Sequence, residues 1–147
     1  MMRTTFQKEV MEILGITENQ VSSIPLDKER DFYALAFEMY EKGDYRGAAA
    51  LFTQLVLTDP FSQHYWHGLA SSKQMAREYH AAMHAWSLVA LLKEGDPMPH
   101  FHAAECLLSL DDKEEALKAL DAALNFCKDE TLQEKIHLLK AIHYVRH

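Results

Sequence analysis

Lys42-Gly43-Asp44-Tyr45 is the stretch that decides the fold, because its pattern returns twice at a fixed interval. Ala76-Arg77-Glu78-Tyr79 follows 34 residues later, and Leu110-Asp111-Asp112-Lys113 follows after another 34. A constant period of this length is the signature of an array in which each repeat is one supersecondary unit. With no insertion or deletion between them, the units span residues 29–62, 63–96 and 97–130.

Small residues recur in the same columns of every unit. One column holds Ala36, Ala70 and Ala104, and a second holds Ala48, Ala82 and Ala116. Two antiparallel helices that pack at close range need small side chains where their backbones approach. We therefore predict three helical hairpins, with helices over residues 28–42, 45–58, 61–76, 79–93, 97–109 and 112–126. Gly43 suits the turn between the first two helices, and Pro60 is expected in the first turn of the third.

Two further helices flank the hairpins. Residues 130–145 carry one apolar stripe, which predicts a capping helix: Leu132, Ile136, Leu139, Ile142 and Val145. Near the start, Thr4 and Gln7 form a possible capping box and Gly15 is a stop signal. Between them one apolar face consists of Phe6, Val10, Ile13 and Leu14. This helix either contacts a partner or folds back on its own repeats, and residues 16–27 read as a linker.

The resulting division is a segment 1–27, a possible dimerisation element, and a repeat domain 28–147. The fold class is all-α, a short α-solenoid. One hairpin cannot bury its own apolar face, so the hairpins must stack.

Composition excludes several classes of function. The chain has 147 residues and a net charge of −7, whereas a nucleic-acid partner requires a basic surface. Two cysteines, Cys106 and Cys127, do not make a disulfide framework, and we expect them to be buried and reduced. No stretch approaches a membrane span or a signal peptide, so we expect a cytoplasmic protein.

The first helix of each hairpin should line the concave side of the stack. Its inward positions include more aromatic residues than a solvated surface needs, which is typical of pockets for anchor side chains. The positions are Arg30, Tyr33, Phe37, Tyr40, His64, His67, Ser71, Gln74, Met98, Phe101, Glu105 and Leu108. The alternative is that Tyr33 and Phe37 pack against the N-terminal segment.

Neither a metal site nor catalysis is expected. His80 and His84 have the spacing of a zinc pair on a helix, but no further ligand completes the set. Cys106 and His102 lie four residues apart in an alanine-rich run, which favours a buried structural thiol. The sequence contains no motif for a phosphate loop or an activated nucleophile, so we expect no cofactor and no enzyme activity.

The columns resemble tetratricopeptide repeats, although Lys73 and His100 depart from the family's preferences. Two runs are more specific, Leu35-Ala36-Phe37-Glu38-Met39-Tyr40-Glu41-Lys42-Gly43-Asp44-Tyr45 and Pro99-His100-Phe101-His102-Ala103-Ala104-Glu105-Cys106-Leu107-Leu108. They resemble the class II chaperones of type III secretion systems, the SycD/LcrH-like group.

That resemblance implies a bacterial cytosolic chaperone that holds an extended segment of a hydrophobic translocator protein in its groove. It implies that the segment is kept from aggregating or pairing before export, without nucleotide hydrolysis. It also implies a homodimer formed through the N-terminal region, by the face of Phe6, Val10, Ile13 and Leu14. The groove residues that it implies are Tyr33, Phe37, Tyr40, His64, His67, Phe101 and Leu108.

Two alternatives stay open. A co-chaperone that captures the carboxylate tail of an ATP-driven chaperone needs Lys and Asn in the groove. The first unit has Tyr33 and Phe37 instead. A structural adaptor is the other alternative.

Overall fold

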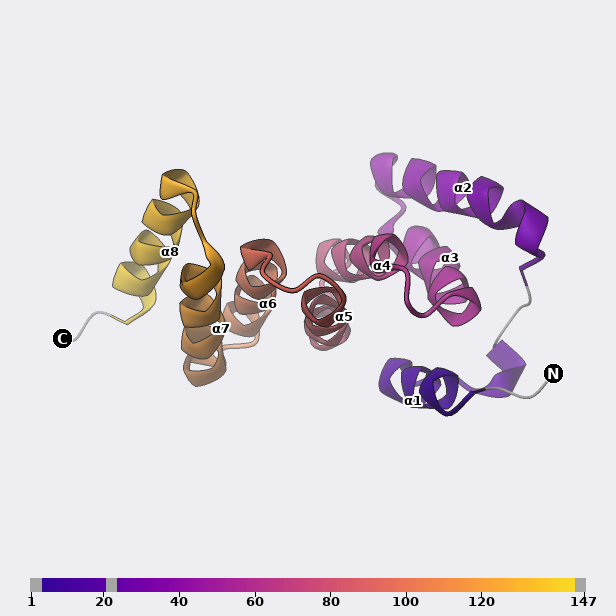
Figure 1. Cartoon of the computed structure of the whole chain (residues 1–147), viewed down its shortest axis with the longest axis horizontal. Helices are drawn as coiled ribbons and strands as arrows, with labels where there is room; N and C mark the ends of the chain where they lie inside the picture. The colour runs from indigo at the N-terminus through magenta and orange to yellow at the C-terminus, as the bar shows by residue number, and fades with distance from the viewer. Residues whose placement is uncertain (1–3, 21–23, 145–147) are drawn as a thin grey trace.

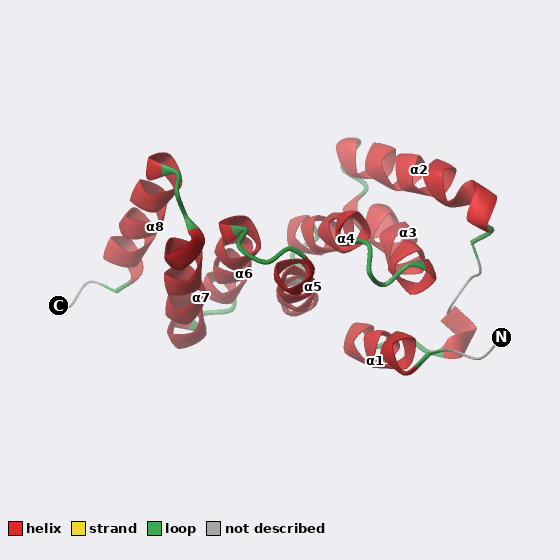
Figure 2. Cartoon of the chain, viewed as in Figure 1, coloured by secondary structure: helices red, strands yellow, loops and turns green. Residues whose placement is uncertain are grey.

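The structure is a computed structural model that describes residues 4–20 and 24–144. Within these ranges the chain forms helices joined by short turns, with no strand (Figure 2). The predicted all-α fold class is therefore confirmed. Residues 21–23, in the predicted linker, and residue 145, at the predicted end of the last helix, lie outside the described residues.

Three helical hairpins follow one another along the long axis of the molecule (Figure 1). Within each hairpin, and from each hairpin to the next, consecutive helices pack against each other. The helices are α2 (Glu29–Glu41), α3 (Tyr45–Thr58), α4 (Gln63–Met75), α5 (Tyr79–Leu92), α6 (Pro97–Ser109), α7 (Lys113–Phe126) and the closing α8 (Glu130–His143).

The turns inside the hairpins place one residue in the left-handed region at the same repeat position. Gly43 has φ of 85°, Arg77 has 63° and Asp111 has 59°. Only glycine adopts this conformation without a Cβ penalty, so the first turn is the least strained of the three. Asp44 is the N-cap of the helix after the first turn, and its side chain accepts a hydrogen bond from the Gly47 amide at 3.0 Å.

Helix α4 begins two residues later than the sequence indicated. Pro60 was expected in its first turn, but it lies in the loop before the helix. Ser62 is the N-cap, with its hydroxyl accepting from the Tyr65 amide at 3.4 Å. The carbonyl of Pro60 instead accepts from the Trp66 indole nitrogen at 2.7 Å, which satisfies the one polar atom of that buried ring.

The N-terminal helix, α1 (Thr5–Leu14), has both predicted end signals. Thr4 and Gln7 form the capping box, and Gly15 ends the helix with φ of 68°. Helices α1 and α2 lie on opposite sides of α3 (Figure 1), so α1 does not cover the surface of Tyr33 and Phe37. Short 3-10 turns, η1 (Glu18–Gln20) and η2 (Leu26–Lys28), lie between α1 and α2.

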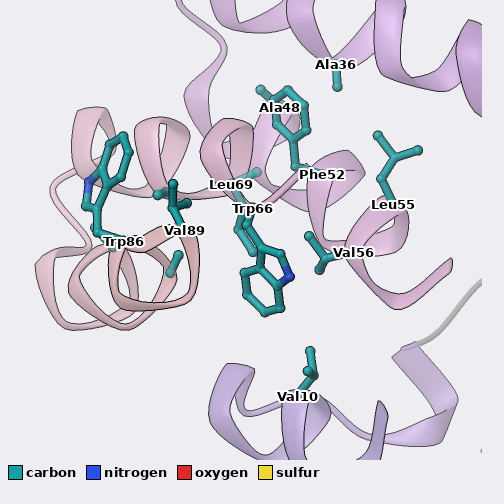
Figure 3. Close-up of a cluster of buried hydrophobic side chains, with 14 of the residues drawn as sticks. Val10, Ala36, Ala48, Phe52, Leu55, Val56, Trp66, Leu69, Trp86 and Val89 are labelled. Atoms are coloured by element: carbon teal, nitrogen blue, oxygen red, sulfur yellow. The ribbon is translucent and has the colours of Figure 1, made fainter. Parts of the chain in front are cut away.

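One large apolar cluster spans α1 to α6. It contains the indoles of Trp66 and Trp86 and the ring of Phe52, all buried. Val10 reaches from α1 toward Trp66 and Val56 (Figure 3) and is 1% exposed. A second cluster joins α6, α7 and α8 through Phe101, Leu120, Leu132 and Ile136. Leu132, Ile136 and Leu139 of the predicted stripe therefore pack on the last hairpin, whereas Ile142 is 62% exposed and does not.

Candidate functional site

An apolar pocket, here called the aromatic pocket, lies between α2 and α4. Its cavity has a volume of about 190 Å³. It is surrounded by five of the seven groove residues that the family resemblance implies, by Ser71, which is a further predicted inward position, and by two residues that were not predicted there. The first five are Tyr33, Phe37, Tyr40, His64 and His67, and the last two are Phe52 and Gly68.

The aromatic rings of the pocket form a connected wall. The Tyr33 ring meets the edge of buried Phe52 at 5.9 Å between ring centres and lies 5.6 Å from the Tyr65 ring. Phe37 lies 6.5 Å from Tyr33 and is 51% exposed. A half-exposed phenyl beside a cavity is an uncovered apolar surface that another side chain can bury.

Gly68 makes room for this pocket. A Cβ placed there would lie 2.3 Å from Cε1 of Phe52, so only glycine lets α4 approach that ring. The two equivalent residues, each 34 positions further on, are His102 and Ile136. Sequence reasoning missed Gly68, although a glycine inside a helix pattern is a signal of close packing.

A second cavity, here called the polar pocket, lies beside the aromatic pocket and reaches toward α6. It has a volume of about 240 Å³ and shares Tyr40 and Ser71 with the aromatic pocket. Because the two cavities share a wall, an extended chain can occupy both. Its other lining residues are Gln74, Met75, Trp86, His102 and Glu105.

A hydrogen-bonded network fixes the polar side chains of this second pocket. Glu105 Oε1 accepts from His102 Nδ1 at 2.7 Å and from Gln74 Nε2 at 3.3 Å. Gln74 Oε1 in turn accepts from the Trp86 indole nitrogen at 2.8 Å, and the His102 ring stacks on Trp86 at 4.6 Å. Burial acts to raise the pKa of Glu105, but the bonds from His102 and Gln74 outweigh it and hold the pKa below its ordinary value.

His67 approaches the same indole from its other side, edge-on at 4.9 Å. Burial lowers the pKa of His67, and the nearby His102 lowers it further. We therefore assign His67 as a neutral ring on the wall of the aromatic pocket at neutral pH.

A wider, more polar cavity of about 790 Å³ opens from the other end of the aromatic pocket and shares Tyr33 and His64 with it. Here the Tyr65 hydroxyl donates to Glu29 at 2.8 Å. Burial and this carboxylate raise the pKa of Tyr65, so the phenol keeps its proton. The three cavities together form the trough.

Phe101 does not line the trough, and its assignment to the groove was wrong. It occupies the same repeat column as Tyr33 but is only 2% exposed. Helix α8 covers it, since Leu132 and Ile136 join its cluster and Lys135 Nζ lies 5.2 Å from the ring centre. Leu108, the other expected residue of the third unit, is half-buried and lines neither the aromatic nor the polar pocket.

The expected dimerisation face is mostly occupied within the chain. Val10 is buried in the main cluster, and Phe6 stacks on Phe61 at 5.0 Å. Gln7 Nε2 also donates to the Leu57 carbonyl at 3.1 Å, which ties α1 to α3. Leu14 packs at the edge of the cluster, whereas Ile13 is 48% exposed. Val10 is therefore corrected from a contact between copies to a core residue.

Within the described part of the chain, the remaining reactive side chains do not form a second metal-binding or nucleophilic site. Among residues 4–20 and 24–144, no group of three or more His, Cys, Asp or Glu is placed to hold a metal ion. Cys106 is buried, and burial with the neighbouring Glu105 raises the pKa of its thiol to about 12. None of the helices in the described part of the chain is long and apolar enough to span a membrane.

Sequence comparison finds relatives across most of the chain. No family model matches it. The low calcium response locus protein H of Yersinia pestis is 34% identical over 113 residues, 77% of this chain. The matched region covers about two thirds of each curated relative's length. It covers 66% of the Yersinia pestis protein and 65% of its Yersinia pseudotuberculosis counterpart.

Solved structures share the fold. The Yersinia enterocolitica type III secretion chaperone SycD, in complex with a peptide of the translocator YopD, matches with a TM-score of 0.68 and 29% identity. The match covers 81% of this chain and 99% of SycD, and SycD has also been solved as a dimer.

Pseudomonas aeruginosa PcrH, in complex with the chaperone binding region of PopD, matches with a TM-score of 0.73 and 27% identity. That match covers 82% of this chain and 94% of PcrH. Sequence and fold thus agree with the resemblance read from the repeat columns. The chain is similar in sequence and in fold to the translocator chaperones of type III secretion systems.

Proposed function

We propose that this protein is a chaperone that holds an extended segment of a type III secretion translocator in its trough. The bound segment is kept from aggregating and from associating before export. The observation that carries the proposal is the aromatic pocket, where half-exposed Phe37 borders an open cavity of about 190 Å³. The translocator peptides bound by SycD and PcrH support the same use of the same fold.

The energy available in the trough is sufficient for this role. Burying one apolar anchor side chain contributes ~1.5–3 kcal/mol, from which the cost of ordering the segment is subtracted. Micromolar binding requires about 8 kcal/mol, so several anchors along the trough must be filled together. The chaperone works in the bacterial cytosol and catalyses no reaction, because holding a segment requires only a complementary surface.

Coexpression with the translocators of the same secretion system tests the proposal. We expect the wild-type chain to keep a translocator in the soluble fraction and to copurify with it. Phe37→Ala should weaken binding tenfold or more by calorimetry, because it removes the exposed anchor surface. Leu91→Ala is the matched control, since Leu91 is 68% exposed on α5 and does not line the trough pockets.

The alternatives give different results in the same experiment. Retention of an ATP-driven chaperone through its carboxylate tail would favour the co-chaperone reading. If wild type, Phe37→Ala and Leu91→Ala bind the translocator equally well, the translocator is not held in the trough.

We also propose that the chain forms a homodimer, as SycD does in one of its structures. Ile13 is the exposed apolar residue of the predicted N-terminal face. Ile13→Glu should shift the mass measured by light scattering from dimer to monomer while the melting temperature stays near that of the wild type. An unchanged mass would exclude α1 as the contact.

A further inference from the structure

We propose that the polar pocket selects a lysine or arginine side chain of the bound segment, with the Glu105 carboxylate as its counter-ion. This inference rests on the proposed function, because it names a property of the segment held in the same trough. It goes beyond that function because it predicts which residue must accompany the apolar anchor.

The carboxylate is held in place by its neighbours. His102 Nδ1 and Gln74 Nε2 both donate to Oε1 of Glu105, and Gln74 is itself oriented by the Trp86 indole. A fixed acceptor loses little conformational freedom on binding, so its charge contributes more than that of a mobile surface side chain. The lowered pKa of Glu105 means that this carboxylate is ionised at neutral pH.

Lys135 does not neutralise the pocket. Lys135 lowers the pKa of Glu105, but its effect is the weakest of those acting on that group. Its amino group lies over the Phe101 ring, 5.2 Å from the ring centre. The ion pairs found in the described part of the chain do not join Lys135 to Glu105. The recorded ion-pair partner of Glu105 is His102, which offsets the carboxylate charge only when its ring is protonated. With a neutral His102 ring, the pocket keeps a negative charge that a ligand can meet.

The walls of the polar pocket suit a long basic side chain. Tyr40 and Met75 supply an aromatic and a flexible apolar surface on which the methylene groups can lie. A cation beside an aromatic ring gains further attraction, and a guanidinium can meet a carboxylate with two parallel hydrogen bonds. The net charge of −7 of the whole chain favours a basic partner over an acidic one.

The two pockets are built from the same repeat columns and differ in chemistry. Phe37, Ser71 and Glu105 occupy one column at intervals of 34 residues. The aromatic pocket is bordered by Phe37 and Ser71, and the polar pocket by Ser71 and Glu105. A phenyl at one end of the trough and a carboxylate at the other predict an apolar residue and a basic residue at a fixed spacing in the bound segment.

A display library of random twelve-residue peptides, selected on the full chain, tests this inference. We expect wild type to enrich peptides with an apolar anchor and a Lys or Arg at one spacing from it. Glu105→Gln keeps the size and one acceptor oxygen, and should retain the anchor but lose the basic residue. Glu114→Gln, on the exposed start of α7, removes the same charge elsewhere and should select as wild type does.

The best selected peptide is then synthesised with its basic residue and with norleucine at that position. On wild type the basic peptide should bind about tenfold more tightly, and on Glu105→Gln the two should bind alike. Glu105→Met provides the same comparison if the glutamine variant loses its helical signal.

Two results would overturn the inference, and they are distinguishable. Peptides that share a Phe37-dependent apolar anchor but no excess of Lys or Arg would refute the basic preference and leave the proposed function intact. Failure to enrich any peptide whose binding depends on Phe37 would refute the proposed function, and the inference with it.

Discussion

Three successive helix crossings in this molecule use the same column of side chains and give different surfaces. Where α4 crosses the first hairpin the column holds Gly68, and the Phe52 ring fills the space beside an open aromatic pocket. Where α6 crosses the second hairpin it holds His102, which stacks on Trp86 and lines the polar pocket. Where α8 meets the third it holds Ile136, buried in one cluster with Leu120 and Phe101. One side chain per crossing decides between pocket and core.

The column of Tyr33, His67 and Phe101 gives the same lesson. Tyr33 and His67 border the aromatic pocket, while Phe101 is sealed under α8. A repeat position that binds a partner at one end of the array therefore stabilises the fold at the other.

The largest expected effect contrasts two phenylalanines. Phe101→Ala should lower the free energy of unfolding by ~3–5 kcal/mol, because it empties a buried site. Phe37→Ala should lower it by ~1 kcal/mol or less, because half of that ring faces solvent. Urea unfolding measures both. Similar losses of unfolding free energy for the two variants would contradict the assignment of Phe37 to an open surface and of Phe101 to a buried site.

A side chain added at Gly68, where α4 crosses the first hairpin, should fill part of the aromatic pocket. Gly68→Ala forces the Phe52 ring to move and should lower stability by ~1–3 kcal/mol, while weakening peptide binding about tenfold. Adding Phe52→Leu to the same chain should restore part of the stability, so a double-mutant cycle should give a favourable coupling of ~1 kcal/mol. Additive losses would mean that Gly68 and Phe52 do not share this space.

The hairpin turns permit a smaller comparison. Gly43→Ala places a Cβ at a positive φ and should lower stability by ~1 kcal/mol. Arg77→Ala is the matched control, because Arg77 already has a Cβ at the same turn position, and its effect should be near zero. Thermal unfolding of the two variants measures the difference, and a cost for Arg77→Ala equal to that of Gly43→Ala would refute the turn assignment.

The smallest effect concerns two serines. The hydroxyl of Ser72 is fully buried without a hydrogen-bond partner among the described residues, so Ser72→Ala should be neutral or stabilise by up to ~1 kcal/mol. Ser62→Ala should instead cost ~1 kcal/mol, because Ser62 caps α4. Shifts of the denaturation midpoint in opposite directions would distinguish the two roles. A lower midpoint for both variants would show that the Ser72 hydroxyl has a hydrogen-bond partner.

Much of the fold could be predicted because the repeat period carries it. The alanine columns and the turn at Gly43 define the hairpins, so the helices agree with their predicted spans to within one or two residues. The start of α4 differed because Ser62 competes with Pro60 as the local signal, and a side-chain cap decides where the helix begins.

The site was less predictable, because sequence periodicity places a residue on a face without saying what covers that face. Phe101 was placed in the groove by its column, but α8 continues the same 34-residue phase and covers it. Val10 lies on an apolar face that either a second copy or the chain itself could bury, and the pattern does not distinguish them. Gly68 was missed because its importance lies in an absent side chain.

Photo-crosslinking shows whether the aromatic pocket receives a side chain of another protein. A photoreactive phenylalanine analogue is placed at position 37 and, as a control, at position 91, in cells that produce the secretion system. We expect the analogue at position 37 to crosslink to one extended segment of a translocator, and the analogue at position 91 not to crosslink to it. Attachment of the same translocator with equal yield at both positions, or none at position 37 while the two proteins copurify, would contradict this expectation.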